Sequence, residues 1–106
     1  MNINTLVTKA HDNARAHGFW DADQNIGNKC ALIHSEVSEF FEGYRKGKHV
    51  EPDEHCPNNT NQSIELADII IRVADLAGYL CIDLEDAIKA KMDYNKGRPH
   101  LHGKKF

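Results

Sequence analysis

Two apolar segments of the chain each carry a pair of acidic residues three positions apart. Glu36 and Glu39 lie in KCALIHSEVSEFFEGY (residues 29–44), and Glu65 and Asp68 lie in IELADIIIRVADLA (residues 64–77). Residues three apart project from neighbouring turns of one helical face. Packing the two segments together would therefore gather the carboxylates of both pairs, which repel one another unless protons or cations compensate their charge.

A site made only of carboxylate oxygens favours hard divalent cations, so the spacing predicts bound Mg²⁺, with Mn²⁺ as the other candidate. A redox di-iron bundle would need Glu-x-x-His pairs. No glutamate in the chain has a histidine three residues later. Isolated Glu-x-x-Glu pairs are common on exposed helices, but two pairs inside apolar segments favour a metal site.

Two further charged residues continue the acidic stripe of the second segment. On a helix, Glu65, Asp68, Arg72 and Asp75 fall within an arc of roughly 80°. Arg72 is one turn from Asp68, so it is expected either to orient that carboxylate as an outer partner of a metal ligand or to form a simple intrahelical ion pair. Asp75 is expected to support the same site.

Four helices are expected to position these residues, in an all-α, four-helix bundle-like fold over a single domain, residues 1–106. Apolar residues at helical spacing predict helices over about 4–17, 28–46 and 62–80, and a fourth from just after Asp83 to about Lys96. Gly18, Gly47 and Gly97 are natural stops. The polar segment 48–62, with its prolines and asparagines, is predicted to be a loop.

Composition narrows the functional class. A net charge of −3 argues against a general nucleic-acid binder, although residues 87–106 are locally basic. No run approaches the roughly 20 apolar residues that a membrane span needs. Three cysteines without a Cys-x-x-Cys motif fit reduced thiols and a cytoplasmic protein. A chain of this size has a poor surface-to-volume ratio, which favours a homo-oligomer.

The acidic pairs resemble a known signature. Glu36-x-x-Glu39, separated by 25 residues from Glu65-x-x-Asp68, is similar to the ExxE…ExxD motif of the all-α nucleoside triphosphate pyrophosphohydrolases, most closely the small MazG-like branch. The stretches IRVADLAGYLCIDLEDAI (residues 71–88) and KMDYNKGRPHLHGKKF (residues 91–106) also look like that branch. The resemblance covers about residues 26–106.

This resemblance implies a MazG-type fold, assembled as a homodimer or a dimer of dimers (a homotetramer). It implies Mg²⁺-dependent hydrolysis of (deoxy)nucleoside triphosphates to the monophosphate and pyrophosphate, in nucleotide-pool housecleaning. Glu36, Glu39, Glu65 and Asp68 would hold the metal, and Glu36 and Glu39 would be catalytic, with Glu39 as the base. The residues implied to face the phosphates are Lys91, Asn95 and Arg98.

Two residues outside the motif are further candidates for substrate binding. Trp20, the only tryptophan, either stacks on a nucleobase or plugs one end of the bundle. Lys29 lies on the same helical face as Glu36 and reaches either a phosphate or a carboxylate. The alternative function is a non-catalytic, oligomeric helical binding module whose acidic stripe binds a cation or a basic partner.

Overall fold

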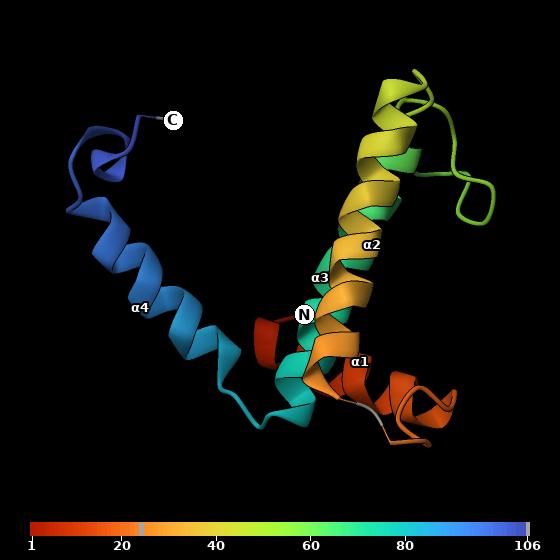
Figure 1. Cartoon of the computed structure of the whole chain (residues 1–106), viewed down its shortest axis with the longest axis horizontal. Coiled ribbons are helices and arrows are strands. Elements are labelled where there is room, and N and C mark those ends of the chain that lie inside the picture. The colour runs from red at the N-terminus through yellow and green to blue at the C-terminus, as the bar shows by residue number, and fades with distance from the viewer. Residues whose placement is uncertain (24, 106) are drawn as a thin grey trace.

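A computed structural model describes residues 1–23 and 25–105 and contains four α-helices (Figure 1). They are α1 (Ile3–Ala16), α2 (Ile26–Arg45), α3 (Asn61–Tyr79) and α4 (Leu84–Lys96), followed by a short 3₁₀ turn, η1 (His100–Gly103). Within these described ranges the β-structure is limited to an isolated bridge between Pro52 and Thr60. The all-α prediction is confirmed, and each helix lies where the sequence predicts it.

Local capping explains where the helices begin. Each starts after a polar residue whose side chain accepts a hydrogen bond from the backbone N–H three positions later, which satisfies an otherwise free donor. These caps are Asn2, Asn25, Thr60 and Asp83. The hydrogen bond from the backbone of Asp86, helped by one from the Asn4 side chain, lowers the pKa of Asp83.

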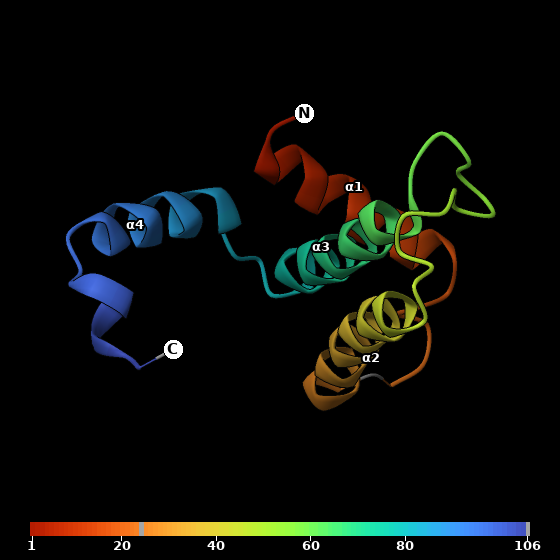
Figure 2. The same ribbon diagram turned by 90° about the horizontal axis from the view of Figure 1, so that it is seen from above.

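Helix α3 is the central element, with α1 on one side and α2 on the other (Figure 2). The buried apolar side chains among the described residues are Val7 and Ala10 of α1 and Ala74 and Ala77 of α3. Such small side chains let the two helices approach closely. At Gly78 an added Cβ would lie 2.6 Å from Cβ of His11, so this glycine is required by the α1–α3 crossing.

Helix α4 does not complete a bundle within the chain. It leaves the end of α3 and projects away from α2 and α3 in both ribbon views (Figures 1 and 2). Its first turn is tied to the start of α1, where Ile3 N–H donates to Glu85 Oε1 at 3.1 Å and Asn4 Nδ2 donates to Asp83 Oδ1 at 3.1 Å. One chain therefore forms a three-helix unit with a projecting fourth helix.

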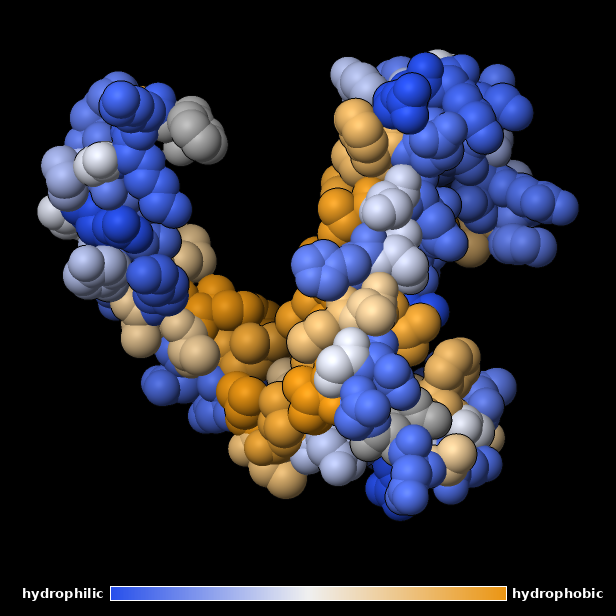
Figure 3. Space-filling model, in the orientation of Figure 1, coloured by the Kyte–Doolittle hydropathy of each residue, from blue (hydrophilic) through white to orange (hydrophobic). Residues whose placement is uncertain are grey.

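This arrangement leaves the chain extended and much apolar surface uncovered. The Cα radius of gyration is 16.1 Å, against about 13 Å for a compact domain of this length. The accessible surface is 7994 Å², against about 6,000 Å² for a compact monomer of this mass. Hydrophobic side chains gather at the base of the V that α4 makes with the other helices and on the side of the α2–α3 arm that faces α4 (Figure 3). None of the described helices is long and apolar enough to cross a membrane.

Candidate metal centre

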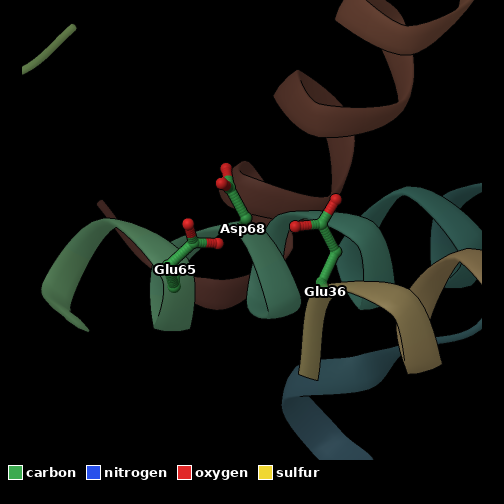
Figure 4. Close-up of side chains that lie close together, drawn as sticks. All are labelled: Glu36, Glu65 and Asp68. Carbon is green, nitrogen blue, oxygen red and sulfur yellow. The ribbon is translucent and has the colours of Figure 1, made fainter. Parts of the chain in front are cut away.

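The packing of α2 on α3 brings three of the four signature acids together. Glu36 projects from α2 toward Glu65 and Asp68, which stand on consecutive turns of α3 (Figure 4). One carboxylate oxygen from each of the three residues lies within 4.8 Å of the others. The spacing of the pairs along each helix produces this arrangement, because i, i+3 residues share a face and the two acidic faces meet.

Glu36 is the buried member of this group and has a partner. It is 7% exposed, and Arg72 Nε donates to its Oε1 at 2.7 Å. The sequence placed Arg72 beside Asp68 on the same helix, but the hydrogen bond crosses to α2 instead. Packing of the two helices gives the guanidinium a closer carboxylate than its own helix offers, and Arg72 still acts on Asp68 through its charge. Arg72 thus holds Glu36 in position.

Among the described residues, the Glu65 and Asp68 carboxyls of α3 have no such hydrogen-bonding partner. Burial, and then repulsion from Glu39 and Asp68, raises the pKa of Glu65. Burial and the charge of Glu36 raise the pKa of Asp68, against a smaller opposing effect of Arg72. Glu65 Oε2 is buried with no hydrogen-bond partner among the described residues. Buried polar atoms are normally satisfied, so this oxygen is available to a ligand.

Glu39 lies at the edge of the group. The neighbouring Glu36 raises the pKa of Glu39, first through side-chain hydrogen bonding and then through repulsion between the two charges. Glu39 is exposed and lines, with Glu65 and His49, a second cavity of about 210 Å³.

The three converging acids fit a hard divalent cation. Mg²⁺–oxygen distances of about 2.1 Å place two ligands on one ion at most about 4.2 Å apart, and the longer Ca²⁺ or Mn²⁺ bonds allow slightly more. The oxygens of Glu36, Glu65 and Asp68, within 4.8 Å of one another, need only a small contraction. The unpartnered oxygen of Glu65 and the excess negative charge are both relieved by a cation there.

A cavity of about 330 Å³ opens beside this group, between α1, α2 and α3. Glu36, Asp68 and Arg72 line it on one side, and its wall also includes Asn13, Phe19 and Asp75. The volume is at the lower end of the range for small-molecule sites, and the lining combines apolar surface with a few polar groups. The acids therefore border a space that a small organic ligand can enter.

Trp20 and Lys29 form a packed cluster with the α1–α2 connection. Trp20 stacks on Tyr79 with ring centroids 4.2 Å apart, and its indole N–H donates to Asp75 Oδ1 at 2.9 Å. Lys29 Nζ lies 4.0 Å from the Trp20 ring centroid and donates to the Phe19 carbonyl at 2.8 Å. Lys29 is 5% exposed, and within the described part of the chain its ammonium group contacts Phe19 and Trp20 and not a carboxylate. Tyr79 and Lys29 therefore cover the Trp20 ring.

Lys91 and Asn95 lie on α4 and Arg98 follows its end, in a part of the chain that projects away from α2 and α3 (Figure 1). Lys91 Nζ and the Arg98 guanidinium lie 4.6 and 5.3 Å from the Tyr94 ring centroid. Arg98 also donates to Asn95 Oδ1 at 3.5 Å. These contacts hold the three candidates, Lys91, Asn95 and Arg98, near one another but leave them remote from α2 and α3 within one chain.

One residue of this region was missed by sequence reasoning. His11 Nδ1 lies 2.8 Å from Asp75 Oδ1, and its ring meets Trp20 edge-on with centroids 5.5 Å apart. An ionised carboxylate accepts only, so Nδ1 carries the proton in this pair. No local motif marks a single histidine on α1, and only its spacing on the face that meets α3 could have identified it.

Comparison of the chain with protein-family models, with curated proteins and with solved structures finds no match. The likeness of the acidic motif to the MazG-like branch therefore stays a prediction.

Proposed function

We propose that this protein is a Mg²⁺-dependent hydrolase that converts (deoxy)nucleoside triphosphates to the monophosphate and pyrophosphate, in nucleotide-pool housecleaning. One observation carries the proposal: the oxygens of Glu36, Glu65 and Asp68 converge within 4.8 Å beside a cavity of about 330 Å³. A triphosphate is polyanionic, so an acidic site accepts it only together with a cation.

Each acid has a role in this account. Glu36, Glu65 and Asp68 hold the ion, which when bound neutralises phosphate charge and acidifies a water. Glu39 takes a proton from the attacking water as its oxygen bonds to phosphorus and the bond to the departing pyrophosphate breaks. Glu39 suits this role because it is exposed and has a raised pKa. A base is most effective when its pKa lies near the working pH.

A second copy of the chain completes this proposal. The accessible surface of the chain is about 2,000 Å² larger than that of a compact monomer of the same mass. Stable dimer interfaces bury surface areas of this size. Val37 and Phe41 of α2 and Ile70 of α3 are among the exposed apolar residues. Covering them with a partner chain allows the partner's α4 to bring its basic residues toward the acids, since α4 does not reach them within one chain. The assembly is thus a homodimer or a dimer of homodimers.

The direct test is pyrophosphate release from a panel of canonical and modified nucleoside triphosphates with Mg²⁺. We expect pyrophosphate release that chelation of Mg²⁺ abolishes. We also expect the rate to fall roughly 100-fold or more in Asp68→Asn, because loss of one group that stabilises charge in the transition state typically has an effect of this size. Glu42→Gln is the matched control, because Glu42 lies one turn beyond Glu39 on α2, has a 50% exposed side chain and pairs with Arg45 and Lys46. Full activity in Asp68→Asn would remove that residue from the site.

The exposed apolar faces also favour a second candidate, a non-catalytic helical module that binds a partner. The same assay separates the two functions. A folded protein that binds Mg²⁺ but releases no pyrophosphate from any nucleotide in the panel is the result that the module predicts and that the enzyme excludes.

A further inference from the structure

The cavity beside the acids has a second polar feature, the Asp75 carboxylate. Asp75 lies seven residues beyond Asp68 on α3, two helical turns and about 10 Å along the axis. Both residues line the same cavity. A ligand whose charged end lies at Asp68 therefore presents its other end to Asp75, and the intervening space can hold the part of the ligand between them.

Asp75 is fixed in place by two donors on one oxygen. Its Oδ1 accepts from the Trp20 indole N–H at 2.9 Å and from His11 Nδ1 at 2.8 Å. Its other oxygen, Oδ2, makes no hydrogen bond with any described residue. Oδ2 is also not buried, so it remains in contact with solvent. The side chain is 15% exposed. Oδ2 is thus accessible, and the cavity that Asp75 lines is where a ligand can meet it.

The chemistry of this oxygen defines the ligand that it accepts. An ionised carboxylate only accepts hydrogen bonds, so Oδ2 favours an N–H donor and disfavours a carbonyl oxygen. Among nucleobases, cytosine, adenine and guanine carry an exocyclic amino group, whereas thymine presents a carbonyl oxygen at the matching position. Phe19 provides apolar contact for a planar ring, and the Asn13 amide provides one further donor and acceptor.

We propose that Asp75 is a specificity-determining residue that selects nucleotides whose base carries an exocyclic amino group, through a hydrogen bond from that group to Oδ2. The inference rests on the proposed function, because it assumes that the triphosphate end of the ligand lies at Glu36, Glu65 and Asp68. Trp20 and His11 are positioning residues here, since they act on the ligand through Asp75.

The test compares dCTP with dUTP, a pair that differs at the amino or carbonyl group of the base. Dissociation constants are measured by calorimetry, and kcat/KM by pyrophosphate release, for the intact protein and for Asp75→Asn. We expect dCTP to be favoured by roughly 10-fold to 100-fold, the usual discrimination of a well-placed base contact. Asp75→Asn, which keeps the shape and replaces the free oxygen by a donor, is expected to abolish or reverse the preference.

Asp12→Asn is the control variant, because it makes the same chemical change at an exposed position of α1 that does not line the cavity. It is expected to keep the preference for dCTP. Equal binding of dCTP and dUTP by the intact protein overturns the inference. So does an Asp75→Asn variant that is folded by circular dichroism and weakened equally for both nucleotides, or a protein that binds neither.

The two proposals fail in different ways. A dCTP preference in binding that Asp75→Asn abolishes, without pyrophosphate release, supports the role of Asp75 and contradicts the hydrolase. Pyrophosphate release from dCTP and dUTP with equal efficiency supports the hydrolase and contradicts the role of Asp75.

Discussion

At the scale of single residues, the carboxylates of the candidate centre oppose folding when no cation is bound. Glu65 and Asp68 are drawn partly out of water and lie near other negative charges, and both effects favour the protonated form. Arg72 compensates Glu36 alone by a hydrogen bond. Such a group of carboxylates destabilises the fold but favours the binding of a cation. Carboxyl groups with perturbed pKa values are commonly found at functional sites.

The first prediction concerns pH and Glu65. Because the pKa of Glu65 is raised above its ordinary value of 4.5 in the folded chain, the folded state holds this proton more tightly than the unfolded state. Below that value both states are protonated. As the pH rises from about 4.5 through the raised pKa, the unfolded state ionises first and the free energy of unfolding falls.

Urea denaturation of the metal-free protein between pH 4 and pH 8 measures this effect. Glu65→Gln, which cannot ionise, is expected to lose less stability than the intact protein over that interval. Added Mg²⁺ is expected to restore stability to the intact protein, by about 2.7 kcal/mol at a concentration 100 times the dissociation constant. Parallel pH profiles for the two proteins would show that Glu65 is not perturbed.

The second prediction concerns the pair of Arg72 and Glu36. Arg72→Met leaves a buried carboxylate without its donor, so we expect a loss of about 1–3 kcal/mol in the free energy of unfolding. Arg72 is 30% exposed on its side chain, which favours the lower end of that range. Adding Glu36→Gln removes the unpaired charge and should recover part of the loss. Additive effects of the two substitutions in denaturation experiments would mean that the pair is not coupled.

The sequence revealed the residues of the centre better than it revealed their partners. The acid pairs are visible because i, i+3 spacing and apolar flanks are local features. The partner of Arg72 lies 36 residues away and that of His11 lies 64 residues away. Those pairings depend on which faces of the helices pack together, and no local rule contains that information.

At the scale of elements, the crossing of α1 and α3 determines the shape of the cavity. The two helices approach at Gly78, where the space for a side chain is taken by His11. The same crossing brings His11 to Asp75 and places Asn13 of α1 in the cavity wall. A change in the spacing of these helices therefore alters both the stability of the unit and the cavity beside the acids.

The third prediction tests this crossing with two matched glycine substitutions. In Gly78→Ala the new Cβ would lie 2.6 Å from Cβ of His11, so the helices must separate, and overpacking of this kind costs about 1–3 kcal/mol. Gly43 lies in the last turn of α2. In Gly43→Ala nothing lies within 4 Å of the new Cβ. That variant should gain up to about 1 kcal/mol from helix propensity.

Thermal denaturation of the two variants checks the prediction. A lower midpoint for Gly78→Ala together with an equal or higher midpoint for Gly43→Ala is the expected result. If both substitutions change the midpoint alike, helix propensity alone explains them and the close crossing is not supported.

Helix positions were predictable from sequence, whereas the placement of α4 was not. Caps such as Thr60 and Asp83 and stops such as Gly97 act locally, so the ends of the helices follow from neighbouring residues. The direction of α4 depends on long-range hydrogen bonds, including that from Ile3 N–H to Glu85, 82 residues apart. The sequence predicts a bundle of four helices. Within one chain the structure instead has three packed helices and one projecting helix.

At the scale of the whole molecule, the chain is extended and leaves apolar surface uncovered. A radius of gyration of 16.1 Å and a wide apolar surface are unfavourable for a single chain in water (Figure 3). Association of two copies buries this surface and is the arrangement that we infer for the proposed enzyme. In that proposed arrangement, the basic residues of α4 are expected to approach acidic residues of a second chain.

The fourth prediction concerns this association. Ile70, 57% exposed on α3, is expected to lie in the interface, so Ile70→Asp places a charge where apolar contacts form and should weaken association strongly. Sedimentation or light scattering should give at least twice the 12.0 kDa chain mass for the intact protein and a lower mass for the variant. Lys9→Asp, at an exposed position of α1, is the control. A monomeric intact protein at micromolar concentration would contradict the inferred association.

The most direct measurement of the central claim is the position of a bound divalent cation. Crystals grown with Mn²⁺, which takes the same oxygen ligands as Mg²⁺, locate the ion by its anomalous scattering. We predict a peak with oxygens of Glu36, Glu65 and Asp68 at about 2.0–2.3 Å, and its loss in Asp68→Asn crystals. A structure at neutral pH and millimolar Mn²⁺ with no peak between these three residues would contradict the account.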